Sequence, residues 1–318
     1  TGKLFRNDSD SLKSHPVFTD VSKAAGICTE GYGNQATIAD INEDGWFDIY
    51  VSNDYISPDL LWINNGNGTF TESLSLYFRH TSNSAMGNDA ADINNDGLVD
   101  FLTLDMNPED NYRKKMMLLP ASYQFFQNSE RFGYNFQYTR NTLQLNQGRS
   151  PGENSSPGLP VFGDIAYFAG IEATDWSWTA LLADFDNDGY RDIFIGNGFP
   201  RDVTDRDFGM FRAMAWNTTP KMEILKQVPE VKIHNYLYRN NANLTFTDVS
   251  KQWGLPAPTF SNGAAYADLD LDGDLDLVVN NINDPASLYA NRTRELNPGS
   301  GNYLSVRLRG SEQNINGL

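Results

Sequence analysis

Four copies of a nine-residue, aspartate-rich loop, each at one fixed distance from a phenylalanine, constrain the fold of this chain more than any other feature. The loops begin at Asp40, Asp92, Asp184 and Asp268. Each of these aspartates lies 22 residues after an aromatic anchor, and the four anchors are Phe18, Phe70, Phe162 and Phe246. Four equal, gap-free spacings predict four copies of one structural unit.

The text around the anchors repeats as well. Residues 17–22 resemble residues 245–250, and a Leu-x-x-Asn pattern recurs at residues 4–7, 61–64, 143–146 and 237–240. A short β-favouring run follows each acidic loop, at residues 49–51, 101–104, 193–195 and 277–279. Each unit therefore reads as about four short strands joined by turns. Such units repeated side by side predict an all-β chain built as a β-propeller.

Two insertions interrupt the repeat. The first aspartates of successive loops lie 52, 92 and 84 residues apart, while the distance from anchor to loop does not change. The excess falls at about 107–140 and about 198–232, and both segments are expected to be partly helical. In the second, Phe208, Phe211, Met214 and Ala215 share one helical face, and Asp202 or Thr204 can serve as the N-cap.

The acidic loops have the composition of calcium sites. Positions 1, 3, 5 and 9 carry oxygen-bearing side chains, position 6 is glycine, and position 7 offers a backbone carbonyl. The predicted ligands are Asp40, Asn42, Asp44, Trp46 and Asp48; Asp92, Asn94, Asp96, Leu98 and Asp100; Asp184, Asp186, Asp188, Tyr190 and Asp192; Asp268, Asp270, Asp272, Asp274 and Asp276. Such all-oxygen sets suit Ca²⁺, and a chain with three histidines and one cysteine is a poor candidate for zinc.

An EF-hand also opens with Asp-x-Asp-x-Asp-Gly, but it needs glutamate at position 12. That position holds Val51, Thr103, Ile195 and Val279 here. A simpler interpretation, that aspartate and asparagine merely favour turns, fits one loop far better than four in register. We therefore expect about four Ca²⁺ ions that stabilise the fold. Low-affinity sites of this kind fill where calcium is about millimolar, which favours an extracellular setting.

The charge and the chain ends narrow the choice of protein class. The formal net charge is −17, which disfavours binding to nucleic acid. Cys28 is the single cysteine, so no intrachain disulfide can form. No apolar window is long enough to span a membrane as a helix. The chain starts at Thr1 and stops soon after a strand-like run at 303–308, so we expect both ends to continue in a longer protein.

The loops resemble the FG-GAP (VCBS-type) repeats of integrin-α-like β-propellers over roughly residues 3–292. Residues 302–308 with 316–317 look like the opening of an ASPIC/UnbV domain, so the resemblance divides the chain into a propeller segment, 1–296, and the start of a further β domain, 297–318. Residues 104–112, 174–178 and 197–202 are similar to large surface lipoproteins of Bacteroidota. That resemblance implies about seven blades in the whole protein and a partnership with SusC/SusD-type outer-membrane uptake systems.

Three functions remain open from the sequence. The first is a non-enzymatic, calcium-stabilised binding or scaffold module on the extracellular face of the outer membrane, or secreted, with a transporter complex and a glycan or peptide ligand as partners. The second is a polysaccharide-degrading enzyme on a propeller, and the third is a calcium-dependent adhesin. No catalytic residue is assigned: His15, His80 and His234 share no spacing, and loop aspartates committed to calcium are poor proton donors.

Aromatic residues outside the loops leave two interpretations open. Trp176 and Trp178 alternate in a strand before the third loop, where packing is favoured over sugar stacking. The first insertion is dense in aromatic residues, which form either a satellite core or a patch for a ligand or partner. These residues are Tyr123, Phe125, Phe126, Phe132, Tyr134, Phe136 and Tyr138.

Overall fold

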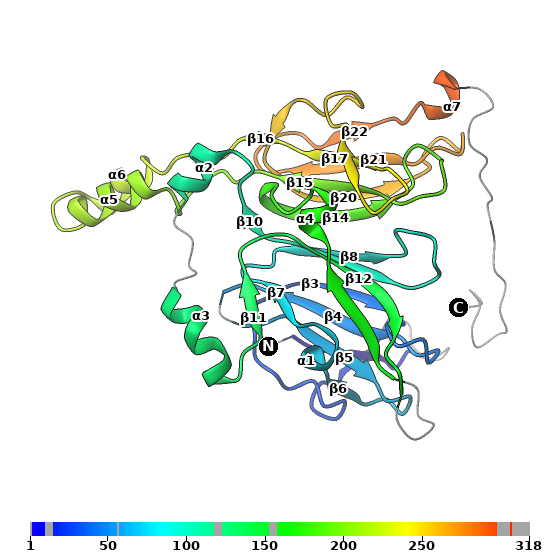
Figure 1. The fold of residues 1–318 in the computed structure, drawn as a ribbon. Helices are drawn as coiled ribbons and strands as arrows, with labels where there is room; N and C mark the ends of the chain where they lie inside the picture. Colours follow the sequence, from blue (N-terminus) through cyan, green and yellow to red (C-terminus); the bar gives the residue numbers. More distant parts are fainter. Residues whose placement is uncertain are drawn as a thin grey trace.

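In the described part of the chain, four antiparallel sheets of three to five strands stand side by side, which confirms the all-β, propeller-like architecture (Figure 1). The computed structural model describes residues 2–9, 15–55, 57–117, 123–152 and 158–297, together with Val306. In Figure 1 the sheets follow the chain in order, from the blue sheet at one end of the stack to the orange sheet at the other. Successive repeats therefore lie next to each other in space.

Each sheet is an up-and-down meander. The first contains β3 (Gly33–Ala39), β4 (Asp48–Asn53), β5 (Leu60–Asn64) and β6 (Phe70–Glu72). The second contains β8 (Gly87–Ala91), β9 (Asp100–Leu104), β12 (Thr142–Arg149) and β13 (Pro160–Asp164). The third contains β14 (Asp175–Ala183), β15 (Asp192–Asn197), β17 (Tyr236–Asn240) and β18 (Phe246–Asp248), with β10 (Met106–Asn107) beside β14. The fourth contains β20 (Ser261–Ala267), β21 (Asp276–Asn281) and β22 (Ser287–Tyr289).

The sheets are offset from the sequence repeats by two strands. A sequence repeat opens with the Leu-x-x-Asn strand, yet β5 and β6 from the start of the second repeat complete the sheet that β3 and β4 begin. The same pairing forms across connections of very different length: six residues join β4 to β5, whereas the two insertions join β9 to β12 and β15 to β17. The leading pair, β1 (Phe5–Asn7) and β2 (Phe18–Asp20), stands as a sheet of its own.

The hydrophobic core lies between the sheets, and the second strand of each middle sheet serves two interfaces. On β9, Phe101 packs toward the first sheet, whereas Leu102 and Leu104 pack toward the third. On β15, Ile193 packs toward the second sheet and Phe194 toward the fourth. Successive side chains of a strand point to opposite faces, so a strand covered on both faces needs a continuous apolar run. This accounts for the β-favouring runs that follow the second and third acidic loops.

The connection from each fourth strand to the next sheet shows how the second copy departs from the others. Gly26, Gly170 and Gly254 adopt positive φ there, and Gly170 ends α4 (Ala166–Ala169). The second copy instead ends α1 (Leu74–Tyr77) at Phe78, whose backbone is extended. Phe78 is 2% exposed, and its ring meets Phe162 at 4.7 Å between centroids. In the second copy, therefore, a buried phenylalanine that packs in the core stands where the other copies have a turn glycine.

The first strands of the sheets lie next to one another and are joined through side chains. Strand β3 contacts β8, β8 contacts β14, and β14 contacts β20. The Gln35 amide donates to the Asn88 carbonyl at 2.5 Å, and the Asp89 carboxylate accepts from the Leu182 N–H at 2.8 Å. Because these strands are not paired by backbone ladders, polar side chains supply the bonds between blades.

Both insertions are partly helical, as expected, and both follow the second strand of a sheet. The first contains α2 (Asn111–Met116), α3 (Tyr123–Ser129), a 3₁₀ turn (Glu130–Phe132) and β11 (Phe136–Tyr138), which pairs in parallel with β7 (His80–Ser82). The second contains α5 (Arg206–Ala215), α6 (Lys221–Leu225) and β16 (Ile233–His234), which pairs with β19 (Pro258–Thr259). All these helices gather on one side of the stack (Figure 1).

One detail expected for the second insertion was wrong, namely its N-cap. Asp205, not Asp202 or Thr204, caps α5, because its carboxylate accepts the Phe208 N–H at 2.8 Å. Of the four residues assigned to one helical face, Phe208 and Ala215 are buried, whereas Met214 is 74% exposed. Periodicity identifies a shared face, but burial also needs a partner, and α6 covers only part of α5.

The remaining helix, α7 (Thr293–Leu296), follows the fourth sheet. Nearly all of the segment expected to open a further domain, 297–318, falls outside the described residues, so that expectation and the division at 296 stay predictions. Within the described ranges, no helix has the length and apolar character needed to cross a bilayer.

Candidate metal centres and the opposite end of the sheets

The four acidic loops occupy one structural position. Each joins the first strand of a sheet to its second, so all four lie at the same end of the sheets, here called the acidic-loop end. Neighbouring loops touch: the Asn95 amide donates to the Gly189 carbonyl at 2.9 Å, and the Asn187 amide donates to the Asp274 carboxylate at 2.7 Å. The second, third and fourth loops thus form a continuous row.

The loops share one backbone shape with two residues in the left-handed region. Position 6 is glycine, with φ between 86° and 95°. Position 4 also has positive φ, although its residues are Glu43, Asn95, Asn187 and Leu271. Asparagine tolerates this region, whereas glutamate and leucine pay a steric cost there. The sequence pattern identified the glycine at position 6 but gave no sign of the positive φ at position 4.

Hydrogen bonds hold the carboxylates at positions 1 and 5 in place. In the first loop the Asp40 carboxylate accepts the N–H groups of Asp44 and Gly45 at 3.1 and 2.9 Å. The Asp44 carboxylate in turn accepts the Trp46 N–H at 2.9 Å. The same bonds recur in the second, third and fourth loops. Each loop therefore orients its carboxylates by its own backbone.

The third and fourth loops each bring three carboxylates to one point. Oxygens of Asp184, Asp186 and Asp188 lie within 4.8 Å of one another, and so do those of the fourth-loop residues Asp268, Asp270 and Asp272. In the first two loops position 3 is an asparagine, and the Asn42 amide donates to Asp44 at 2.9 Å. The carbonyls of the position-7 residues stay predicted ligands. The donor sets fit a hard divalent cation held by oxygen.

Asp186 supplies a specific sign that a cation belongs in the third loop. Its Oδ1 atom is buried and has no hydrogen-bond partner. Burial, with repulsion from Asp188 and Asp184, raises the pKa of its carboxyl group. A buried acceptor without a donor costs about 1–3 kcal/mol, and more when it is charged. A divalent ion between these carboxylates would remove both penalties.

The aspartates at position 9 have a second task that sequence reasoning missed. In the third loop, Asp192 is 0% exposed and accepts the Phe185 N–H at 3.0 Å and the Asn240 N–H at 2.9 Å. Asp48, Asp100 and Asp276 make the equivalent pair of bonds. Burial raises the pKa of Asp192 to about 7. The aspartate thus joins its loop to the third strand. Each carboxylate oxygen keeps a further lone pair, so the role of the aspartate as a metal ligand stays a prediction.

An asparagine in or just after each third strand completes this junction, and in the third and fourth sheets it also links blades. The Asn240 amide donates to the Ile93 carbonyl of the second loop at 2.8 Å and to the Arg191 carbonyl at 3.0 Å. In the fourth sheet, the Asn291 amide donates to the Phe185 carbonyl of the third loop at 2.7 Å. The Leu-x-x-Asn repeat was the sequence signal for this junction, because its asparagine recurs in register with the acidic loops. The acidic-loop end is therefore one bonded network across the second, third and fourth sheets.

The two insertions meet at the other end of the sheets, here called the insertion end. Arg113 on α2 donates to both carboxylate oxygens of Asp175, at 3.1 and 3.2 Å, and also to Asp202 in the second insertion. Asp175 is buried and has φ of 66°, an uncommon conformation outside glycine. These bonds fix the relative position of the insertions, because either carboxylate without Arg113 would be a buried, unpaired charge.

Packed aromatic rings lie beside this ion network. Trp176 is 6% exposed, and its ring stacks on Phe199 at 4.5 Å between centroids. Trp178 lies 6.0 Å from Trp176 and donates its indole N–H to the Gly198 carbonyl. Met106 and Met117 pack into the same cluster. The tryptophans are thus part of a core that connects β14 with both insertions, as the packing interpretation expected.

The aromatic residues of the first insertion divide into two groups. Phe126 lies 5.3 Å from Phe136 and 5.7 Å from Tyr138, which makes a small satellite cluster. Tyr123 and Phe132 instead expose about 70% of their surface, at 74% and 68%. The satellite-core interpretation is therefore confirmed for the packed rings, whereas a patch for a ligand or partner at Tyr123 and Phe132 stays a prediction.

The three histidines share no site. His80 bonds Asp164 at 3.0 Å, and Arg140 also donates to that carboxylate, in an ion pair on the second sheet. His234 packs against Tyr236 at 4.6 Å, and His15 is exposed. None of these contacts joins a histidine to an acidic loop.

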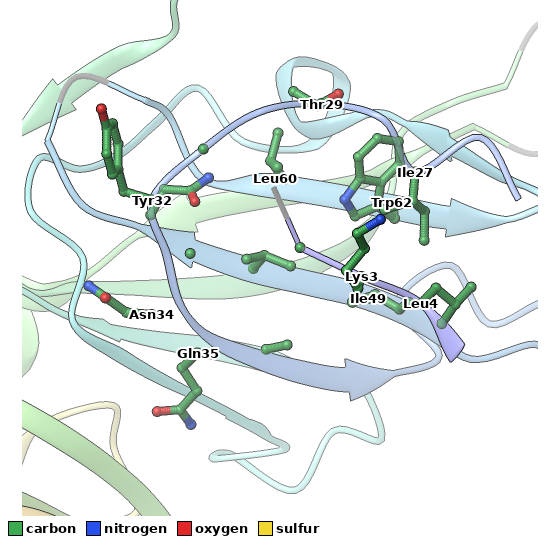
Figure 2. Close-up of a pocket in the computed structure, with 16 residues that line it drawn as sticks. Lys3, Leu4, Ile27, Thr29, Tyr32, Asn34, Gln35, Ile49, Leu60 and Trp62 are labelled. Carbon is green, nitrogen blue, oxygen red and sulfur yellow. The ribbon is translucent and has the colours of Figure 1, made fainter. Parts of the chain in front are cut away.

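A half-open hollow of about 430 Å³ lies on the outer face of the first sheet (Figure 2). Ile49, Leu60 and Trp62 supply its apolar wall, and Lys3 and Leu4 cross above them. Figure 2 shows the polar side chains of Asn34 and Gln35 at one side, away from this apolar group. The hollow is separate from the acidic loops and the insertions, and nothing in it converges on one point as the loop carboxylates do.

Comparison with known proteins supports the repeat. The FG-GAP-like repeat family matches residues 40–103 and 232–279, segments that contain the first, second and fourth acidic loops. Cartilage acidic protein 1 of Mus musculus is 24% identical over 310 residues, which cover 88% of this chain and 45% of that protein. The chain thus spans less than half the length of this curated relative. It contains FG-GAP-like repeats in a four-bladed propeller arrangement.

A solved structure of an Agrocybe aegerita lectin, described as recognising non-reducing terminal N-acetylglucosamine, is a more distant match. It shares 16% identity and a TM-score of 0.35, over 83% of this chain and 52% of the lectin chain. A likeness at this level carries no argument about the fold or the ligand of this protein.

Proposed function

We propose that these FG-GAP-like blades form a non-enzymatic, calcium-stabilised scaffold at a bacterial cell surface, as an accessory to a SusC/SusD-type outer-membrane uptake complex. The observation that carries the proposal is the separation of two ends. Loops that fit cations bond neighbouring blades at one end, and two insertions rise from the other. The metal then maintains the scaffold, and the insertions contact the partner.

Calcium is the cation proposed for the loops, with one ion in each and about four in all. Aspartate and asparagine oxygens supply every predicted side-chain ligand, and the buried Asp186 oxygen without a hydrogen-bond partner supports an ion in the third loop. Low-affinity calcium sites fill outside the cell, which supports an extracellular or secreted location. The wider resemblance to surface lipoproteins supports the outer membrane, a lipid anchor, and continuation into an ASPIC/UnbV domain.

A scaffold role fits the buried acids outside the loops better than catalysis does. Asp59 and Asp105 are 0% exposed. The Asp105 carboxylate accepts backbone N–H groups of Asn83 and Met106, and Asp59 accepts the Tyr50 hydroxyl. Acids enclosed in this way have no path to a substrate, so they serve the fold. We place a glycan or peptide ligand on the exposed insertions, where Tyr123 and Phe132 are accessible.

The proposal is tested by purifying the protein from membranes of its source organism in mild detergent with calcium present. We expect a SusC-type transporter to co-purify, and Tyr123→Asp with Phe132→Asp to abolish this association because both rings are exposed on the first insertion. Leu76→Asp is the matched control, since Leu76 is similarly exposed, at 65%, but lies on α1 outside the insertions. A monomer that carries no transporter would refute the proposed partnership.

A further inference from the structure

The second insertion carries a helical hairpin, residues 206–228, that extends away from the sheets (Figure 1). It consists of α5, the turn after it, and α6. With ten residues, α5 is about 15 Å long. The hairpin is the element in Figure 1 that reaches farthest from the stack on the insertion side.

The hairpin keeps its shape through a small core of its own. Phe208 and Ala215 on α5 pack with Ile224 on α6 and with Val228. Asp205 caps the first turn of α5. The inner faces of the two helices are therefore already occupied. Among the described residues, the other apolar side chains of the hairpin do not belong to this core.

The base of the hairpin is firmly attached to the blades. Phe199 and Val231 pair as a β-bridge across its two ends, and Met117 of the first insertion pairs with Asp205. Arg113 binds Asp202 just before the helices begin. The hairpin is thus a rigid projection, so a surface that binds its tip pays little for ordering it.

The outer surface of the hairpin is rich in apolar side chains. Met210, Met214 and Met222 are 65%, 74% and 67% exposed, and Trp216 is 52% exposed. Met210 and Met214 lie one turn apart on α5 and share a face. Leu225 of α6 is also exposed. Scattered apolar residues are ordinary on a surface, but this many on one short projection indicate a contact site.

The charge of the hairpin is opposite to that of the rest of the chain. Residues 206–228 hold four basic residues and two acidic ones, a net charge of +2, so the remaining residues carry −19. The Lys221 ammonium group lies 5.2 Å from the centre of the Trp216 ring. Basic groups therefore stand next to the exposed apolar side chains.

We propose that the tip of this hairpin binds the headgroup region of an anionic lipid bilayer. Tryptophan and other apolar side chains interleaved with lysine and arginine suit that layer, where rings enter the acyl boundary and cations meet phosphate. A length of about 15 Å exceeds the Debye length of about 8 Å, so the acidic body stays largely screened from the same lipid charge. An apolar protein groove without acidic residues at its rim would gain nothing from the basic residues.

This inference goes beyond the proposed function, because a scaffold that binds a transporter does not require contact with lipid. The test uses the purified chain with calcium and sedimented vesicles, either of phosphatidylcholine alone or of phosphatidylcholine and phosphatidylglycerol in equal parts. We expect binding to the anionic vesicles. Met214→Ser with Trp216→Ser should weaken it about ten-fold or more, because two apolar side chains no longer enter the bilayer.

Charge and matched controls complete the experiment. Arg212→Glu, an exposed change outside the hairpin core, should weaken binding to anionic vesicles and reduce its dependence on salt. Leu76→Ser, equally exposed but far from the hairpin in the chain, should bind as the unchanged protein does. The inference is overturned if the chain stays in solution with both vesicles, as a hairpin built for a protein partner would. It is also overturned by equal binding to neutral vesicles, or by an equal loss in Leu76→Ser.

Discussion

Replacing Asp192 by alanine separates the two tasks of the loop aspartates. Its carboxylate is fully buried and accepts the N–H groups of Phe185 and Asn240, which belong to the loop and to the third strand. Alanine leaves both donors buried without an acceptor. Each orphaned donor costs about 1–3 kcal/mol, so we expect the free energy of unfolding to fall by about 2–6 kcal/mol.

This loss should persist when calcium is removed, because the two bonds do not need the ion. Asp188→Ala is the matched control: Asp188 lies in the same loop, but its carboxylate is exposed and serves the predicted metal site. When the free calcium concentration is 100 times the dissociation constant of a site, binding adds about 2.7 kcal/mol to the free energy of unfolding. We therefore expect Asp188→Ala to lose about this much with calcium and little with a chelator.

The assay is urea unfolding of both variants and the unchanged chain, in calcium and in chelator, followed by tryptophan fluorescence. The reasoning fails if Asp192→Ala costs less than about 1 kcal/mol in chelator, since two buried N–H groups cannot lose their acceptor so cheaply. It also fails if Asp188→Ala costs the same with and without calcium.

Three further predictions concern the ions, a buried acid and the link between blades. Chelation should lower the melting temperature of the unchanged chain, and calcium but not magnesium should restore it; identical melts with and without chelator would contradict the calcium assignment. Burial raises the pKa of Asp105 to about 7, so this residue holds its proton more tightly when folded, and its contribution to stability, up to about 4 kcal/mol, is lost as pH rises from about 4 to 7. Asp105→Asn introduces the residue found at the equivalent positions Asn53, Asn197 and Asn281. It should flatten the plot of unfolding free energy against pH between about 4 and 7, and an unchanged slope would disprove the role of Asp105. Asn240→Ala should cost about 1–3 kcal/mol in urea unfolding because the Ile93 and Arg191 carbonyls lose their donor. Asn64→Ala should cost less, because the Asn64 NH₂ group donates to the Phe47 carbonyl of its own sheet, while both asparagine oxygens accept an equivalent N–H; equal losses would argue against the link between blades.

Much of the fold follows from local pattern. The runs at 49–51, 101–104, 193–195 and 277–279 became β4, β9, β15 and β21, because β-branched and aromatic residues favour strands. In β9 and β15 the run is apolar on both faces because both faces are covered. Glycine at position 6 of each loop marked a left-handed turn, which the structure contains. The expected insertions contain helices because both depart from the period-two pattern of strands.

Other features had no local signal. Met214 shares a helical face with buried residues, yet it is exposed because α6 covers only part of α5. The positive φ at Glu43 and Leu271 is imposed by the loop as a whole, since neither residue favours it. Arg113, Asp175 and Asp202 form a network across segments distant in the chain, and no spacing rule relates them.

The acidic loops separate what the sequence determines from what the tertiary structure decides. Their residue types and regular spacing by themselves determined that four oxygen-rich turns join strands in four equivalent units, because turn chemistry and strand period are local properties. Only the tertiary structure decided that the ninth residue joins each loop to a third strand, and that Asn240 and Asn291 link one blade to the loop of the previous blade. Those bonds depend on which strands become neighbours, and that is set by packing between sheets rather than by any one repeat.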